Sequence, residues 1–264
     1  MATRARGKRA PARARAVAAP DAPDDRLRGD PLGRSAHFRL LPAAERRRLL
    51  GHGAERVLRE GEVLFAEGEP CRGLYILVEG QVELRQVSPR GREQVLHSEG
   101  PGATLGEAPL FDRGGYVASA VATAPTRALF VPRAAIVALF RRYPEVALSL
   151  LETMARRVRH FAELAGRLTF RPVHERVAHY IVGAAGGPGR RVPTGLTVDL
   201  GLTQEQLAAR VGTVRELVAR AFSQLEKSGV IARDRSRITI RDPVRLGRLA
   251  RGAEEPAPAR GSVM

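Results

Sequence analysis

The feature that most constrains the fold is a change of pattern at Pro132. Before it, from about residue 55, short alternating apolar runs are separated by Gly or Pro, which is typical of strands in a small antiparallel barrel or roll. After it, apolar residues recur every three or four positions, which is typical of helices. This change of pattern therefore predicts an α+β protein whose β domain lies N-terminal to its helices. We expect strands at 62–65, 74–78, 82–84, 94–96 and 128–131, with turns at Gly61, Gly68, Gly80, Gly91 and Gly102.

Helical patterns occupy 42–53, 134–142, 144–168 and 172–184. The third is long, and its apolar stripe resembles a coiled-coil seam. A helix of this length at the edge of a small domain needs a partner, and we expect that partner to be a second copy of the chain rather than its own barrel. The residues predicted to form this dimer contact are Leu150, Leu151, Met154, Val158, Phe161 and Leu168.

A helix-turn-helix is predicted near residues 203–226. Thr203 and Gln206 have the spacing of a capping box, and Val211-Gly212 follows as a tight turn. Thr213 is then expected to cap a second helix with Glu216 at its third position. The apolar face of that helix comprises Val214, Leu217, Val218, Ala221, Phe222 and Leu225. Two short helices joined in this way place the second one in the major groove of DNA.

The polar face of the second helix carries Arg215, Glu216, Ala219, Arg220 and Ser223. Arg suits guanine O6 and N7, and Glu accepts from cytosine N4, so Arg215, Glu216 and Arg220 are predicted to read a half-site that contains G·C pairs. The alternatives are that Glu216 only completes a capping box and that Arg220 meets a phosphate.

Phosphate contacts are expected at Thr203 and Gln204, which lie at a helix N-terminus, and the further candidate DNA contacts are Thr213, Ala219 and Ser223. Short strands at 230–231 and 237–240 form a predicted β-hairpin wing around 234–236. Arg235 or Arg237 in this wing would contact phosphate or form a solvated basic turn.

The formal net charge of +16 favours a polyanionic partner, although the Arg-rich composition of a GC-rich genome would give the same bias.

Cys71 is the only cysteine, which excludes an intrachain disulfide and an iron–sulfur cluster and fits the cytoplasm. No apolar run approaches the roughly 20 residues that span a bilayer, so no membrane partner is expected. No catalytic triad order, phosphate-binding loop, dinucleotide fingerprint or metal cluster is present, and the chain is therefore not predicted to be an enzyme.

Five segments follow from these patterns. Residues 1–33 are expected to be a disordered basic arm, for which a transit peptide is the alternative. The others are a β-roll sensor domain at 34–142, the dimerisation helix and hinge at 143–170, a winged helix-turn-helix at 171–250 and a disordered tail at 251–264.

The chain resembles the family of the cyclic-AMP receptor protein and the fumarate–nitrate reduction regulator (CRP/FNR) over residues 37–245. The resemblance rests on several motifs in order: Gly61-Glu62-x-Leu64-Phe65-x-x-Gly68, Leu74-Tyr75 with Gly80-x-Val82, Gly102-x-x-x-Gly106-Glu107, Met154-Ala155-Arg156-Arg157, and Gly212-x-x-Arg215-Glu216-x-x-x-Arg220. It implies a cyclic-nucleotide-binding-like jelly roll, a homodimer, and DNA half-sites read by residues 215, 216 and 220. Residue 219 is Ser in one branch, and Ala219 is closer to the cyclic-AMP branch.

The same resemblance places an effector pocket at Gly106, Glu107, Val117, Ala118, Arg157 and Phe161. Cyclic-nucleotide binders of this family hold the phosphate with an Arg-Ser pair, for which this chain has Val117 and Ala118. Neither side chain can hold a phosphate, so cyclic AMP is not the expected effector.

Gly114-Gly115-Tyr116 is similar to branches related to nitrogen oxides and redox, some of which use haem. A haem ligand would come from His37, His52, His97, His160, His174 or His179, and the alternative is that these histidines are structural or solvated. Cys71 as a redox switch is a weaker alternative, since no second cysteine can resolve it.

The sequence thus predicts a transcription regulator that binds double-stranded DNA as an effector-controlled homodimer, with RNA polymerase as a further candidate partner. The rival hypothesis is a cyclic-nucleotide-binding-like module that controls another protein, such as an enzyme or a channel.

Overall fold

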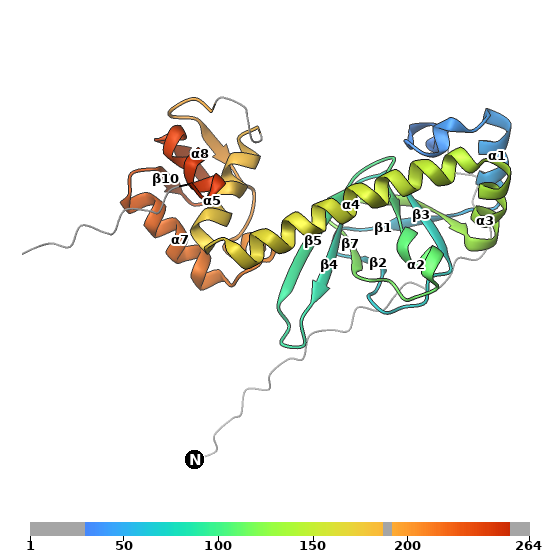
Figure 1. Ribbon diagram of the computed structural model, residues 1–264, viewed down its shortest axis with the longest axis horizontal. Coiled ribbons are helices and arrows are strands. Elements are labelled where there is room, and N and C mark those ends of the chain that lie inside the picture. The colour runs from blue at the N-terminus through green and yellow to red at the C-terminus, as the bar shows by residue number, and fades with distance from the viewer. Residues whose placement is uncertain (1–29, 187–191, 254–264) are drawn as a thin grey trace, which may run out of the picture. The chain divides into compact units, whose positions relative to one another are not determined.

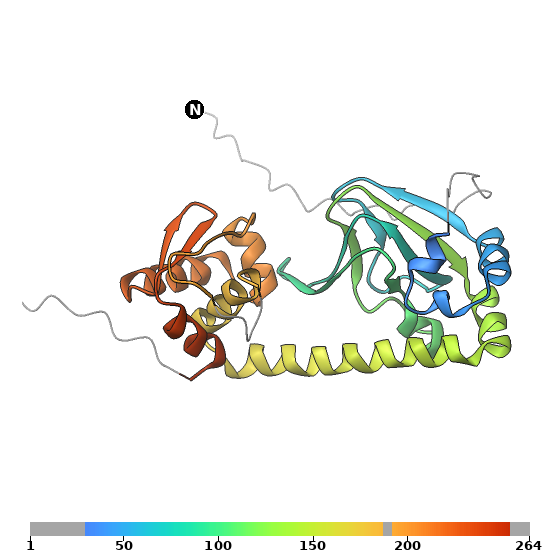
Figure 2. The same cartoon turned by 90° about the horizontal axis from the view of Figure 1, so that it is seen from above.

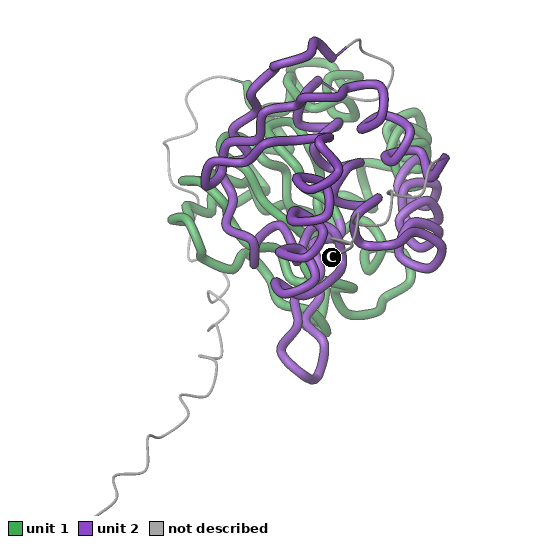
Figure 3. The backbone as a smooth tube through the Cα atoms, turned by 90° about the vertical axis from the view of Figure 1, so that its left-hand side faces the viewer, with its two compact units in different colours: residues 1–85, 97–154 green, residues 86–96, 155–264 purple. Residues whose placement is uncertain are grey.

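The computed structural model describes residues 30–186 and 192–253, and these form two compact units. The first contains residues up to 85 together with 97–154, and the second contains 86–96 together with residues from 155 onwards (Figure 3). Residues 1–29 and 254–264, which include most of the predicted basic arm and tail, lie outside the described residues.

The first unit opens with two 3-10 helices, Pro31–Arg34 and Phe38–Leu40, and a short helix α1 (Ala43–Gly51). The Asp30 carboxylate accepts a hydrogen bond from the Gly33 amide and so begins the first turn. Leu32 and Phe38 are fully buried in the core of this unit. The prediction that disorder extends to residue 33 was therefore wrong for residues 31–33, because Leu32 anchors this segment.

The roll consists of two four-stranded sheets with the orders β1-β8-β3-β6 and β2-β7-β4-β5 (Figure 1). Its strands are β1 (Ala54–Leu58), β2 (Val63–Phe65), β3 (Gly73–Glu79), β4 (Val82–Val87), β5 (Glu93–Glu99), β6 (Thr104–Leu105), β7 (Ser119–Ala122) and β8 (Thr126–Pro132). The predicted antiparallel roll is confirmed. All five predicted turn glycines have positive φ, a conformation that glycine adopts without steric cost.

Strand β3 forms the centre of the core. Its residues from Gly73 to Val78 are buried without alternation, because the helices α2 (Glu107–Asp112) and α3 (Arg133–Arg142) also contact it. A strand that is covered on both faces reads as a continuous apolar run.

Helix α4 runs without a break from Pro144 to Phe170 (Figure 2). It begins where the sequence predicts and extends two residues further than residue 168. Leu150 is fully buried in the first unit, whereas Leu151 is 52% exposed and Val158 is 67% exposed. Of the predicted dimer residues, Leu150 therefore packs within its own domain and leaves no surface for a second chain.

The second unit contains α5 (Val173–Ala184), β9 (Thr197–Asp199), α6 (Gln204–Val211), α7 (Arg215–Lys227), β10 (Ile231–Asp234), β11 (Arg237–Ile240) and α8 (Pro243–Arg251). The strands form a sheet in the order β10-β11-β9, of which the sequence predicts the β10–β11 hairpin but not β9. Ile181, Leu207, Val218, Leu225 and Leu246 belong to one buried core. Helix α8 reaches Arg251 and ends at Gly252, so the predicted tail is ordered at its start.

Within the described ranges, no helix has the length and apolar character that a bilayer crossing requires.

Candidate DNA-binding site and effector pocket

Helices α6 and α7 form the predicted helix-turn-helix. The Thr203 hydroxyl accepts from the Gln206 amide at 3.2 Å, and the Gln206 side chain accepts from the Thr203 amide at 2.9 Å. The predicted capping box is thus confirmed. At the other end of α6, Gly212 takes a left-handed conformation with φ of 69°, which turns the chain toward α7.

Arg176 of α5 holds this turn in place. Its Nη1 donates to the carbonyls of Val211 at 2.7 Å and Gly212 at 3.0 Å. Burial lowers the pKa of Arg176 from its ordinary value, but an arginine remains charged at physiological pH. Arg176 is a supporting residue that sequence reasoning missed, because its partners are backbone carbonyls that leave no side-chain pattern.

The start of α7 differs from the prediction. Val214 is the N-cap and supplies no side-chain hydrogen bond, while Thr213 lies one residue earlier and is 6% exposed. The prediction that Thr213 caps this helix was wrong. Glu216 consequently lies at the second helical position and completes no capping box. The alternative that Glu216 serves only as part of a capping box is therefore excluded.

The polar face of α7 is exposed at Arg215, Glu216 and Arg220. None of these three side chains has a hydrogen bond or an ion pair among the described residues. Ala219 and Ser223 are half-buried on the same helix. The opposite face packs into the core through Val218, Ala221, Phe222 and Leu225, as predicted. Two predicted members of this face are exceptions: Leu217 is 38% exposed, and Val214 is half-buried and lies outside the core cluster.

The remaining candidate DNA contacts lie in three places. Thr203 is exposed and Gln204 is half-buried at the start of α6, whereas Thr213 is buried. In the wing, Arg235 is exposed and has positive φ, and Arg237 lies 3.8 Å from Asp199 of β9. Arg235 is thus the wing arginine that is better placed to meet a ligand.

The roll places part of the predicted effector pocket around Gly106. This residue has φ of 94°, and the buried Glu107 carboxylate accepts a hydrogen bond from Thr104. Ala118 is buried, whereas Val117 is 57% exposed. Arg157 and Phe161 belong to the second unit, so their place in this pocket stays a prediction.

Tyr116 occupies the space beside Gly106. A Cβ on Gly106 would lie 3.1 Å from the Tyr116 ring, which stacks on Phe65 with 3.8 Å between ring centroids. Burial is the main cause that raises the pKa of Tyr116 from its ordinary value, so the phenol is neutral. In the sequence, Tyr116 stood out only as part of a motif that is similar to the nitrogen-oxide and redox branches of the family. In the structure, Tyr116 is the side chain that faces Gly106.

The histidines differ in how far they could serve a haem. Both ring nitrogens of buried His37 face hydroxyl groups, Ser149 at 2.8 Å and Thr153 at 3.5 Å. His160 Nε2 lies 3.1 Å from the Leu96 carbonyl. Burial and the nearby Arg167 and Arg171 lower the pKa of His179, which favours its neutral form. The hydrogen bonds give His37 and His160 structural roles.

A β-roll, a long helix and a winged helix-turn-helix together define a DNA-binding transcription regulator with a sensory domain. Family models match both halves: a cyclic nucleotide-binding domain at residues 55–143 and a Crp-like helix-turn-helix domain at 175–249. The chain belongs to the CRP/FNR family of transcription regulators, whose members it resembles in sequence as well as in fold.

Two curated relatives are similar over most of their length. The CRP-like cAMP-activated global transcriptional regulator of Mycobacterium tuberculosis is 36% identical over 191 residues, covering 72% of this chain and 85% of the relative. The cyclic AMP receptor protein of Thermus thermophilus is 31% identical and covers 86% of this chain and 99% of the relative. Both are regulators rather than enzymes, as predicted for this chain.

Among solved structures, the c-di-GMP-responsive global regulator CLP of Xanthomonas campestris has a TM-score of 0.66 and 21% identity. The match covers 76% of this chain and all of that one, and it shows the fold. The names of these proteins refer to different nucleotides, so the fold alone does not define an effector.

Proposed function

We propose that this regulator is an effector-controlled homodimer that binds a pseudo-palindromic operator, with α7 of each protomer in a major groove. The observation that carries the proposal is the polar face of α7. Arg215, Glu216 and Arg220 are exposed and unpaired among the described residues, while the opposite face is fixed in a packed core. A fixed helix with free Arg and Glu side chains is what base readout requires.

The dimer is inferred from the apolar surface of α4. Leu148, Leu151 and Val158 are 61%, 52% and 67% exposed on this 27-residue helix. Pairing with a second copy would remove this surface from water. A two-fold axis would then set inverted half-sites about 34 Å apart, which is one turn of DNA.

The proposed control is a population shift. An effector that favours one arrangement of the α4 pair would reorient the DNA-binding units about the break between Phe170 and Val173. The protein would work in the cytoplasm, where DNA and RNA polymerase are available as partners.

The operator can be found by selecting bound fragments from random duplexes. Arg220→Ala should then weaken operator binding by about 1–3 kcal/mol per lost base contact and relax the preference at that base pair. Lys227→Ala is the matched control, since it removes an exposed charge at the other end of α7. Operator affinity is measured by fluorescence anisotropy. If Arg220→Ala binds the operator as tightly as the unmodified protein, Arg220 makes no base contact.

We further propose that the effector is not cyclic AMP. The neutral Tyr116 ring fills the space beside Gly106, and Val117 and Ala118 offer no group that could neutralise a phosphate. The rival is cyclic AMP itself, which is favoured by the name of the Mycobacterium tuberculosis relative. Titration of the full chain with cyclic AMP by calorimetry should give no binding heat and no change in operator affinity. Tight binding with enhanced operator affinity would establish the rival.

A further inference from the structure

The β4–β5 hairpin ends in a basic turn that is closed by hydrogen bonds. Pro89, Arg90 and Gly91 form the loop, and the Ser88 amide donates to the Arg92 carbonyl at 2.8 Å to close it. The Ser88 hydroxyl also accepts from the Arg92 amide at 3.0 Å, and Gly91 has φ of 76°. This three-residue loop with glycine in the left-handed region is a favoured hairpin geometry. We call residues 88–93 the hairpin tip.

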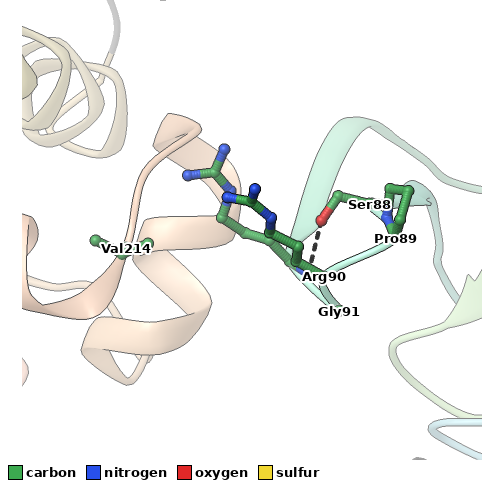
Figure 4. Close-up of a pocket in the computed structure, with 6 residues that line it drawn as sticks. Ser88, Pro89, Arg90, Gly91 and Val214 are labelled. Atoms are coloured by element: carbon green, nitrogen blue, oxygen red, sulfur yellow. Dashed lines mark hydrogen bonds between the residues drawn. The ribbon is translucent and has the colours of Figure 1, made fainter.

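The hairpin tip belongs to the same compact unit as the helix-turn-helix. Next to the tip on β5, Gln94 packs on the turn between α6 and α7. A Cβ on Gly212 of that turn would lie 2.7 Å from the Oε1 atom of Gln94. A first open cleft of about 590 Å³ is lined by the tip and Val214 (Figure 4), and a second of about 490 Å³ is lined by the tip and by residues of α6 and α7. Val214 lines both, and Arg215 and Glu216 line the second. The tip therefore faces the end of α7 that carries the predicted base readers.

The charges of the hairpin tip suit an anionic partner. Arg90 and Arg92 are exposed, and neither has an ion-pair partner in the part of the chain that the structure describes. Glu93 of the tip and Glu205 and Glu216 of the helices bring carboxylates to the second cleft. Arg90 and Arg92 line the first cleft, whose lining includes no carboxylate residue, so a phosphate would be held at the first cleft rather than at the second.

We propose that the hairpin tip is a second DNA contact, in which Arg90 and Arg92 bind the sugar–phosphate strand that borders the groove entered by α7. The inference rests on the proposed function. When the first turn of α7 enters a major groove about 12 Å wide, the strand beside that groove must pass close to that turn. The second cleft is lined both by the tip and by this first turn of α7, and a guanidinium group can donate to two phosphate oxygens at once.

This contact reads no bases. It adds affinity for any duplex and fixes the position of α7, as phosphate contacts do in general. It also makes binding more sensitive to salt, because each neutralised phosphate releases counterions and contributes about 0.9 to the slope of log K against log salt.

The test compares the full-length protein with Arg90→Ala/Arg92→Ala on the selected operator and on random DNA across a salt series. The double variant should bind both DNAs more weakly by a similar factor, so that the ratio of the two affinities is kept. Its salt slope should be smaller by about 3 to 4 for the two tips of a dimer. Arg90→Lys/Arg92→Lys should keep most of the slope, since Lys still neutralises a phosphate.

The matched control is Arg47→Ala/Arg48→Ala, which removes the same charge from exposed positions of α1. It should retain a slope close to that of the unmodified protein. If the tip variant matches this control, the tip does not touch DNA, and if it binds DNA more tightly, the tip obstructs α7; either result overturns the proposal. Failure of the unmodified protein to prefer any sequence would instead refute the proposed function.

Discussion

At the scale of single residues, the two helices of the helix-turn-helix begin in opposite ways. Helix α6 has a complete capping box at Thr203, whereas α7 begins at Val214, which has no side-chain acceptor. The first amides of a helix have no intrahelical partner, and Ser, Thr, Asp or Asn at the N-cap satisfies one of them. Helix α7 therefore lacks a stabilising N-cap hydrogen bond that helix α6 has.

Replacing Val214 with Ser should supply this interaction. We expect Val214→Ser to be more stable than Val214→Ala by about 1 kcal/mol, because only Ser can accept from an amide of the first turn. The Ala variant is the control for the loss of the Val side chain. Urea unfolding monitored by circular dichroism measures both, and equal midpoints would show that the start of α7 adopts no capping geometry.

Single residues also show where sequence reasoning reaches its limit. The capping box of α6 follows from residue types and spacing alone. The orientation of Tyr116 does not, because a shift of one residue along an extended segment moves a side chain to the opposite face. The sequence assigned Val117 to the pocket, and the structure leaves Val117 exposed while Tyr116 faces Gly106.

At the scale of elements, Arg176 connects α5 to the turn of the helix-turn-helix through the carbonyls of Val211 and Gly212. Arg176→Met keeps a long side chain but removes both donors. Leaving these carbonyls unpaired should cost about 1–3 kcal/mol of local stability. We expect faster amide hydrogen exchange in α6 and at the start of α7.

Arg248→Met, at an exposed position of α8, is the control for loss of an arginine from this unit. Its exchange rates in α6 should match those of the unmodified protein. Equal protection of α6 in Arg176→Met would mean that the turn is held by its own backbone hydrogen bonds.

The elements that were predicted share a clear pattern, and those that were missed lack one. The apolar runs of β3 and β8 and the 3.6-residue period of α4 and α7 fix these elements from sequence. Strand β7 consists mainly of Ser and Ala, which have no strand preference, and it exists because β2 and β4 pair with it. Strand β1, which carries charged residues, likewise depends on its partner β8. An ion pair of 2.5 Å between Glu55 of β1 and Arg127 of β8 also joins the two strands.

At the scale of the whole molecule, the proposed function depends on two copies of the chain. Leu151 and Val158 are seven residues apart on α4, so they lie on one stripe of the helix and are largely exposed in the single chain. In the proposed dimer, each glutamate of Leu151→Glu/Val158→Glu would become a buried charge without a partner. Such a charge costs about 3–5 kcal/mol, so the dimer dissociation constant should rise at least about 100-fold.

Sedimentation equilibrium at micromolar concentration should show a dimer for the unmodified protein and a monomer for this variant. Val57→Glu/Val244→Glu is the control, because it adds the same charge at exposed valines outside α4 and should stay dimeric. The monomer should also lose the gain from binding two half-sites, so that operator and isolated half-site bind it with similar affinity. A glutamate variant that stays dimeric would place the interface on another surface and break the link between α4 and the spacing of the operator.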